Sequence, residues 1–485
     1  MPGTTSHLPH MPPPSSRHHH TVPPLNPALS LLVLALAASL PLLSAAAPAG
    51  GGAGSTSLVL LPPSRYGARC LDGSPPGFYH RQGNGAGANK WLIYLQGGGW
   101  CYSATGCAYR ASTVLGTTRL YKPPSDPAFE PTLRKYGTEF RGMLSASAQE
   151  NPAFFNWNTV MVLYCDGGGF AGSGQRIAVN RTTTLYSDGS RIVDAVLQEL
   201  TARRGMAAAA KVVLSGCSAG GQAVSAVCNR VGAAVPRAAV KCLMDGGFFL
   251  DADDVTGQKY FRSVAKEIVA MHKPVVDPDC RRTYGTQVWK CFFPQNNLFF
   301  VRRPVFVVNS IADYAAIDIA NQGQNASSTS RITHCMNQLF ASNKAAAAAA
   351  AAASGGGVAA AAAAVDAVGG EGGGAVMAAG AAGSTHGKLA SISNHWRDRK
   401  ERNSDSISSN SSSSGGGCSS AELAAIQTYS RRSIMRIRAV LRAKPTFGFF
   451  LVGTIGHCTT IYPQWGQVTR KRENLRQEIT TWIGP

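Results

Sequence analysis

Short, largely apolar segments rich in β-branched and aromatic residues recur along the chain, and several are separated by stretches with helical character. Six have the length of a strand: residues 91–96, 159–164, 211–214, 240–244, 304–309 and 447–452. A continuous apolar run of this length is typical of a strand that is covered on both faces. The pattern predicts an α/β fold with a mostly parallel central sheet and helices on both faces.

One connecting segment has clear helical periodicity. Between Asp188 or Ser190 as a capping residue and Gly205 as a terminator, apolar residues recur at helical spacing. They are Ile192, Val193, Val196, Leu197 and Leu200. Each predicted strand is followed by a loop that carries Gly, Asp, Ser or His, and in a doubly wound sheet such loops meet at the carboxyl edge, where ligands bind.

The N-terminal part of the chain does not follow this pattern. Residues 1–54 form a leader in which residues 28–47 are apolar and end in small residues, as in a secretory signal peptide cleaved near Ala45–Ala47. An uncleaved signal anchor is the alternative, because the run is close to the length that spans a bilayer. Either way we expect the secretory pathway, with no stable membrane association once the leader is cleaved.

A second segment, residues 344–420, consists of Ala runs followed by Gly and Ser runs. It has few large apolar residues to bury, so we interpret it as a disordered low-complexity insertion whose deletion leaves fold and activity largely intact. Residues 55–343 and 421–485 remain, roughly 350 residues, which is enough for one large core. We expect a single domain and a monomer.

The 12 cysteines indicate an oxidising compartment, and their spacing contains no C-x-x-C pair that would indicate zinc. We therefore expect no metal. Two pairs close short loops and are candidate disulfides: Cys101 with Cys107, and Cys280 with Cys291.

The formal charge of +20 implies an attraction to polyanions. Outside the cytoplasm these are acidic polysaccharides or anionic surfaces more readily than nucleic acid, although Arg-rich faces are also found merely solvated. Asn180 and Asn325 begin glycosylation sequons, which mildly support the secretory interpretation. We expect no nucleic-acid partner.

The candidate chemistry centres on residues 211–222, KVVLSGCSAGGQ. A strand is followed by residues 216–220, which fit G-x-S-x-G, and then by the start of a helix. In α/β-hydrolases this strand, turn and helix expose the serine hydroxyl as a nucleophile. Ordinary Gly/Ser-rich turns also match the pattern, so Ser218 is a candidate whose role depends on a base, an acid and an oxyanion hole elsewhere in the chain.

The candidate base follows by elimination among the 11 histidines. Five lie in the leader, two lie in the insertion and one precedes the first core strand. Of the three downstream of Ser218, His272, His334 and His457, only His457 follows a strand directly. The alternative for His457 is a hydrogen-bonded structural histidine.

The candidate acid is Asp313, just past the strand at 304–309. The order of Ser218, Asp313 and His457 is then that of α/β-hydrolases. Asp245 is the competitor, but it follows the strand directly after the nucleophile, too early for the usual acid. Asp318 falls in what looks like a following helix.

The backbone amide of Ala219 is the first expected donor of the oxyanion hole, and Gly98 and Gly99, after the strand at 91–96, are the second. An ordinary glycine turn is the alternative for the two glycines. Three further residues in strand-end loops are candidates for lining the substrate cleft: Trp100, Asp166 and Asp245.

Nine stretches spread over the globular part match a known family. They are CLDGSPPG at 70–77, GGGWC at 97–101, NWN at 156–158, YCDG at 164–167, LSGCSAGG at 214–221, KCLMDGG at 241–247, FFPQN at 292–296, VNSIAD at 308–313 and GHC at 456–458. Together they resemble the pectin acetylesterase family, whose animal relatives are the Notum-type carboxylesterases. The resemblance implies Ser218 as nucleophile, Asp313 as acid and His457 as base.

The resemblance implies a secreted, cofactor-free serine carboxylesterase that removes acetyl groups from pectin in the cell wall through an acyl-serine intermediate. Departures from the family pattern leave specificity open: Ala315 and Ala316 after the acid, Gln96 before the glycines and Thr459 after the base. The alternatives are another acyl substrate, such as a fatty acyl group on a protein or another acetylated polysaccharide, and a catalytically silent wall-binding protein. Nothing marks a peptide-binding site of a serine peptidase.

Overall fold

The structure is a computed structural model of the chain. It describes residues 55–135, 139–254, 256–321, 334–339, 376–379, 418–470 and 473–484. The chain divides into two units, Met1–Gly51 and Gly52–Pro485, and every described residue lies in the second. The expected leader, most of the expected insertion and the sequon residue Asn325 lie outside the described residues.

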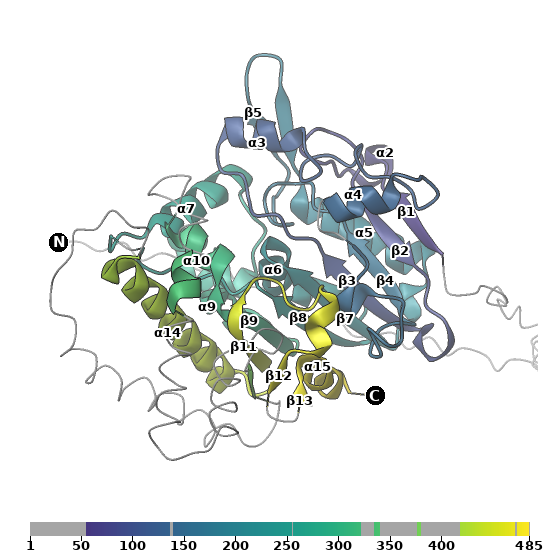
Figure 1. Cartoon of the computed structure of the whole chain (residues 1–485). Helices are drawn as coiled ribbons and strands as arrows, with labels where there is room; N and C mark the ends of the chain where they lie inside the picture. The colour runs from purple at the N-terminus through teal and green to yellow at the C-terminus, as the bar shows by residue number, and fades with distance from the viewer. Residues whose placement is uncertain are drawn as a thin grey trace, which may run out of the picture. The chain divides into compact units, whose positions relative to one another are not determined.

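The second unit contains a nine-stranded sheet in the order β1-β2-β4-β3-β7-β8-β9-β11-β10 (Figure 1). Its strands are β1 (Thr56–Leu60), β2 (Gly77–Arg81), β3 (Lys90–Leu95), β4 (Asn158–Val162), β7 (Lys211–Cys217), β8 (Ala239–Asp245), β9 (Val305–Asp313), β10 (Val376–Ala379) and β11 (Gly448–Gly456). All neighbours from β4 to β11 are parallel. The predicted, mostly parallel sheet is confirmed.

Helices fill the connections and cover the sheet. They are α2 (Pro63–Tyr66), α3 (Ala104–Ala111), α4 (Phe129–Lys135), α5 (Gly189–Arg203), α6 (Ala219–Ala234), α7 (Tyr260–His272), α8 (Pro278–Tyr284), α9 (Pro294–Asn297), α10 (Tyr314–Asn321), α14 (Ser420–Ala443) and α15 (Leu475–Ile483). Two small hairpins are β5 (Gln175–Ala178) with β6 (Thr184–Ser187), and β12 (Thr469–Arg470) with β13 (Glu473–Asn474). Among the described residues, no helix is long and apolar enough to cross a bilayer.

Successive side chains of the central strands point to opposite faces of the sheet, so each strand contributes to two apolar cores. In β3, Trp91, Ile93 and Leu95 join one core, whereas Leu92 and Tyr94 join the other. Helices α5, α6, α7 and α14 pack on the first core, and α4 and α15 on the second. Both faces are therefore covered, which explains why the strands are continuously apolar.

The edges of the sheet differ from the sequence-based expectation. Strands β1 and β2 are antiparallel to their neighbours at one edge, and β10 is antiparallel to β11 at the other. Strand β10, Val376–Ala379, lies inside the expected insertion, where we expected no regular structure. An edge strand is held by backbone hydrogen bonds, which leave little trace in the sequence pattern.

Six disulfides include all 12 cysteines. The two short pairs indicated by spacing are formed, Cys101–Cys107 and Cys280–Cys291. The other four join more distant or unflagged positions: Cys70–Cys165, Cys217–Cys458, Cys228–Cys242 and Cys335–Cys418.

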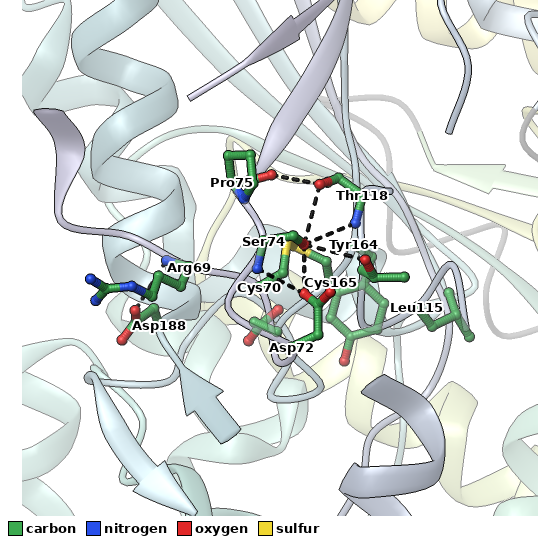
Figure 2. Close-up of a disulfide and its surroundings, with 12 residues drawn as sticks. Arg69, Cys70, Asp72, Ser74, Pro75, Leu115, Thr118, Tyr164, Cys165 and Asp188 are labelled. Carbon is green, nitrogen blue, oxygen red and sulfur yellow. Dashed lines mark hydrogen bonds between the residues drawn. A yellow bond between two sulfur atoms is a disulfide. The ribbon is translucent and has the colours of Figure 1, made fainter. Parts of the chain in front are cut away.

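The Cys70–Cys165 disulfide ties the motif at residues 70–77 to the segment that follows β4 (Figure 2). Within this motif, Asp72 Oδ1 accepts hydrogen bonds from the Ser74 hydroxyl at 2.5 Å and the Ser74 amide at 2.9 Å. The Thr118 amide donates to Ser74 Oγ at 3.2 Å. These contacts give the motif a structural role: it fixes the loop after β4 that borders the site described next.

Candidate active site

Ser218 stands at the turn between β7 and α6. Every residue of β7 is buried, and Ser218 itself has φ 57° and ψ −126°, a conformation that costs a non-glycine residue free energy. Its amide donates to the Asp245 carbonyl at 3.0 Å. A Cβ at Gly220 would lie 2.1 Å from the Leu95 carbonyl oxygen, so the turn tolerates no side chain there. This is the geometry of a nucleophile elbow.

Asp313 and His457 come together at the carboxyl ends of β9 and β11, which are parallel neighbours with Asp313 opposite Gly456. His457 Nδ1 donates to Asp313 Oδ1 at 2.8 Å and lies 3.0 Å from Oδ2. The Asp313 side chain is 1% exposed and that of His457 is 11% exposed. This hydrogen bond is thus shielded from water, and because Nδ1 carries the shared proton, the neutral imidazole has Nε2 unprotonated.

The Nε2 atom of His457 is buried and has no hydrogen-bond partner among the described residues. Burial lowers the pKa of His457, but the charge and hydrogen bond of Asp313, with the charge of Asp245, outweigh it and raise the pKa above its ordinary value. A basic, unpartnered Nε2 is suited to accept a proton, and hydrogen bonds to catalytic bases are often incomplete until substrate binds.

A disulfide joins the residues directly beside the candidate nucleophile and base. Cys217 precedes Ser218, Cys458 follows His457, and the two are bonded although 241 positions separate them. Their Cα atoms are 5.4 Å apart. The bond therefore brings Ser218 and His457 into the same small region of the strand edge.

Asp245 binds the loop that follows His457 and Cys458. Its carboxylate is fully buried and accepts from the Thr459 amide at 2.9 Å, and from the Thr460 amide and hydroxyl at 2.6 and 2.7 Å. Burial raises the pKa of Asp245. We expected Asp245 to contact substrate, but its carboxylate is enclosed. It instead anchors the loop that carries His457.

Asp166 departs from expectation in the same way. It is fully buried, and its oxygens accept from the Gly168 and Phe170 amides, each at 3.1 Å. Burial raises its pKa to about 6. Asp166 therefore shapes the loop after β4, and its enclosed carboxylate is not exposed as a substrate contact would be.

The loop at residues 97–99 passes directly beside the nucleophile. A Cβ at Gly97 would lie 2.9 Å from Ser218 Cβ. Arg110 Nη1 donates to the Gly98 carbonyl at 2.7 Å, and the Tyr164 hydroxyl donates to the Gly99 carbonyl at 2.6 Å.

The hydrogen bond to the Gly98 carbonyl fixes the peptide plane that contains the Gly99 amide. No described residue accepts a hydrogen bond from the amides of Gly98, Gly99 or Ala219. Three unpaired donors beside Ser218 match the requirements of an oxyanion hole.

Trp100 lies in an aromatic cluster beside His457. Its ring centroid is 5.1 Å from that of Phe249 and 5.2 Å from that of Phe292, and the Phe249 ring lies 6.3 Å from His457. Trp100 and Phe292 are 9% exposed and Phe249 is 1% exposed. The Trp100 Nε1 atom is buried without a partner among the described residues. The cluster forms an apolar wall beside His457, and the indole N–H of Trp100 is its one hydrogen-bond donor without a described partner.

The other two histidines downstream of Ser218 take no part in this site. His272 is buried, donates from Nε2 to the Cys101 carbonyl at 2.8 Å and accepts at Nδ1 from the Ser187 hydroxyl at 2.6 Å. Burial lowers its pKa. His334 is exposed in a short helical segment.

Two groups of cysteine and histidine atoms lie close enough together to consider a metal: Cys101, Cys107 and His272, and Cys217, His457 and Cys458. In both groups the sulfurs are bonded to each other as a disulfide. They offer no thiolate, which is the form of cysteine that binds metal ions.

A family model described as Pectinacetylesterase matches residues 53–353, more than half of the chain. The chain belongs to the pectinacetylesterase family. The matched segment includes Ser218 and Asp313, whereas His457 lies beyond it.

Curated relatives agree with this family membership. The chain is 39% identical over 249 residues to pectin acetylesterase 5 of Arabidopsis thaliana, covering 51% of this chain and 55% of the relative. It is 37% identical over 248 residues to pectin acetylesterase 7 of the same plant, covering 51% and 59%. Human palmitoleoyl-protein carboxylesterase NOTUM is 30% identical over 267 residues, covering 52% and 50%. The chain spans about half the length of the curated relatives it matches.

Several residues of this candidate site were not identified from the sequence. Arg110 and Tyr164 donate hydrogen bonds to backbone carbonyls of the loop at residues 97–99, and no sequence motif marks such contacts. The Cys217–Cys458 bond did have a signal, because each cysteine is adjacent to a candidate catalytic residue.

Proposed function

We propose that this protein is a secreted serine carboxylesterase that removes acetyl groups from pectin. The observation that carries the proposal is the strained Ser218 elbow beside a buried His457–Asp313 pair whose Nε2 is unpartnered. A serine hydroxyl is a weak nucleophile until a base removes its proton, and the base needs a carboxylate to orient it.

In the first half of the reaction, His457 Nε2 takes the proton of the Ser218 hydroxyl as Oγ attacks the acetyl carbonyl. The oxyanion that forms is stabilised by the amides of Ala219 and of Gly98 or Gly99. The C–O bond to the sugar then breaks, and the sugar oxygen leaves with the proton from His457. Ser218 is left as its acetyl ester.

In the second half, His457 removes a proton from a water molecule that attacks the acetyl-Ser218 carbonyl. The tetrahedral intermediate collapses, Ser218 Oγ recovers the proton from His457, and acetic acid leaves and ionises to acetate in water. Throughout, Asp313 stays ionised and stabilises the imidazolium. No cofactor takes part in the proposed reaction.

The aromatic cluster favours a substrate with a short acyl group. Trp100, Phe249 and Phe292 pack edge against face and are almost fully buried, so they fill the apolar space next to His457. A fatty acyl chain would have to displace these packed rings. We therefore favour acetyl as the group transferred.

An acidic polysaccharide fits the charge of the chain. A formal charge of +20 attracts a polygalacturonate backbone electrostatically. The plant relatives are named as pectin acetylesterases. We propose acetylated pectin of the cell wall as the partner, bound by a monomer of one esterase domain formed by residues 55–343 and 421–485.

Secretion is supported by the cysteines. Six disulfides persist only in an oxidising environment such as the secretory pathway and the extracellular space. Asn180, a proposed glycosylation site, is exposed near the turn between β5 and β6.

A second candidate is deacylation of a protein. Relatives named palmitoleoyl-protein carboxylesterase match about half of the chain at 29–30% identity. This candidate uses the same catalytic residues and differs only in the acyl group.

Acetate release from acetylated pectin by the purified protein tests the proposal, run beside Ser218→Ala and beside acetylated xylan. We expect release from pectin that vanishes in Ser218→Ala. Hydrolysis of a small aryl acetate without release from either polymer would reject the pectin substrate and keep the esterase. Inactivity on all three substrates would reject the esterase in favour of a wall-binding protein.

A further inference from the structure

A charged cavity of about 520 Å³ opens between the segment after β8 and helix α14. This volume falls in the range of about 300–1,000 Å³ that is usual for small-ligand sites. Its charged lining has four cationic side chains and two carboxylates: Lys259, Arg262, Arg432, Arg436, Asp251 and Asp253. The lining thus carries a net positive charge.

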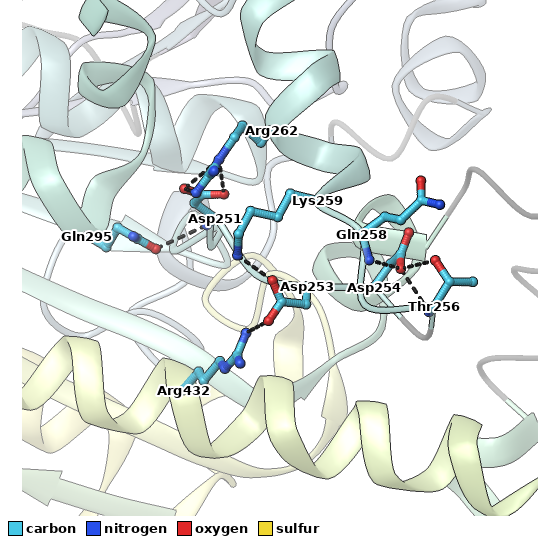
Figure 3. A network of polar contacts seen from close by, with 9 residues as sticks. All are labelled: Asp251, Asp253, Asp254, Thr256, Gln258, Lys259, Arg262, Gln295 and Arg432. Atoms are coloured by element: carbon cyan, nitrogen blue, oxygen red, sulfur yellow. Dashed lines mark hydrogen bonds and ion pairs between the residues drawn. The ribbon is translucent and has the colours of Figure 1, made fainter.

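The two carboxylates hold three of the cations in place (Figure 3). Asp251 pairs with Arg262 through three contacts of 2.5–3.1 Å. Asp253 bridges Lys259 and Arg432, and the contact with Arg432 is 2.6 Å. The ion pairs fix these side chains in position and neutralise only part of their charge.

Arg436 is the cation that remains unpaired. It lies four residues after Arg432 on α14, so both project from the same face of the helix. Arg436 is exposed and forms no ion pair with any described residue. The cavity therefore offers one unpaired guanidinium beside three pre-oriented cations.

One residue that lines the cavity directly follows, in the sequence, a residue that packs beside His457. Leu250 lines the cavity, and the ring of the preceding Phe249 lies 6.3 Å from that of His457. The Leu250 amide donates to the hydroxyl of Tyr429, which belongs to α14 like Arg436. Burial raises the pKa of Tyr429, and the charge of Asp313 adds to the rise. One continuous stretch of protein thus links the cavity to the catalytic groups.

We propose that this cavity is an anion subsite that binds the carboxylate of a uronic acid unit near the acetylated sugar, with Arg436 as its principal ligand. Guanidinium groups bind carboxylates with two parallel hydrogen bonds, which suits a uronate better than a neutral sugar. The inference rests on the proposed function and assigns to this cleft the recognition of an acidic polysaccharide.

The test measures binding of a short unacetylated oligogalacturonate to the Ser218→Ala protein by calorimetry, with a neutral xylo-oligosaccharide of equal length for comparison. We expect the acidic oligomer to bind, binding to weaken with salt, and Arg436→Gln to reduce affinity about ten-fold or more. Arg436→Lys should recover part of the loss. Arg442→Gln, an exposed arginine of the same helix outside the cavity, is the matched control and should bind like the parent.

In the Ser218-containing protein, Arg436→Gln should lower the ratio of kcat/KM for acetylated pectin to that for a small aryl acetate about ten-fold. Equal affinity of Arg436→Gln and the parent, or equal binding of the neutral oligomer, would overturn the subsite. If the protein releases acetate from pectin but Arg436→Gln binds the acidic oligomer as tightly as the parent, only the subsite is wrong and the proposed function stands. Arg436-dependent binding without Ser218-dependent hydrolysis overturns the proposed function instead.

Discussion

At the scale of single residues, the site is organised by buried carboxylates that take different roles. Asp313 faces His457 and orients it, whereas Asp245 and Asp166 bind backbone amides and shape loops. All three follow strands in the sequence and look alike there. Only burial and hydrogen bonding separate them, because these depend on which loops the sheet brings together.

The role of Asp313 can be tested by Asp313→Asn. The amide keeps the size of the side chain but no longer stabilises the imidazolium or fixes its tautomer, so kcat on an aryl acetate should fall about 10⁴-fold with little change in KM. Asp194→Asn, at an exposed position on α5, is the control and should leave kcat unchanged. A kcat within a few-fold of the parent would exclude Asp313 as the acid.

The pH dependence follows from the raised pKa of His457. Only the neutral imidazole can accept the Ser218 proton, so kcat/KM should be constant at high pH and fall as the pH drops through the raised pKa. The acidic limb is therefore expected above the ordinary histidine value of 6.5.

In Asp313→Asn, burial still lowers the pKa of His457, while the largest opposing influence is gone. The limb should then move to lower pH, which a pH profile of the residual activity measures. A limb that stays in place would show that another group controls the acidic side of the profile.

The sequence predicted Ser218, Asp313 and His457 because each lies just after an apolar strand in a known chain order. It did not predict how Asp245 and Asp166 are used. A buried acid that accepts hydrogen bonds from backbone amides and an exposed acid that binds substrate occupy the same kind of position in the sequence.

At the scale of elements, the active-site edge is held together by the Cys217–Cys458 bond between the turn after β7 and the loop after β11. In sheet order these strands are separated by β8 and β9, so ladder hydrogen bonds do not connect them directly. We infer that the disulfide positions His457 relative to Ser218.

Replacing both cysteines, as Cys217→Ala with Cys458→Ala, should lower kcat on an aryl acetate about 10²-fold, because a displacement of about 1 Å can cost that much. The matched control is Cys228→Ala with Cys242→Ala, which removes a bond between α6 and β8 ten residues beyond the nucleophile. Both proteins are compared as folded material, verified by circular dichroism. Equal kcat values in the two double variants would reject a positioning role.

The central strands were predictable because both of their faces are buried, which makes them continuously apolar. Strand β1 has a mixed burial pattern at an edge of the sheet, and β10 is only four residues long. Such strands depend on the neighbouring strand more than on their own composition, so the sequence pattern did not distinguish them.

At the scale of the whole molecule, the C-terminal part of the chain returns to complete the sheet and the site. Helix α14 begins at Ser420 with a capping box from Ser419 and Glu422, next to the Cys335–Cys418 bond. The boundary at 420 that we assigned to the insertion therefore removes residues with structural roles. We propose 344–417 as the dispensable segment, although it contains β10, because this strand has only four residues and pairs in the sheet only with β11 at the edge.

Replacing residues 344–417 with a short Gly/Ser linker should leave aryl acetate turnover within about two-fold of the parent. Replacing residues 344–420 also removes Cys418 and the cap, so its thermal midpoint should be lower, in line with the roughly 2–5 kcal/mol lost when a native disulfide is removed. Thermal unfolding of both proteins measures the difference. Equal midpoints, or insolubility of the shorter deletion, would contradict these boundaries.

The most direct test of the serine-esterase mechanism is covalent labelling with a fluorophosphonate, followed by peptide mapping. We expect one adduct, on the peptide that contains Ser218, absent in Ser218→Ala and formed far more slowly in His457→Ala. Labelling of another residue, or labelling at an unchanged rate without His457, would contradict the assignment of nucleophile and base.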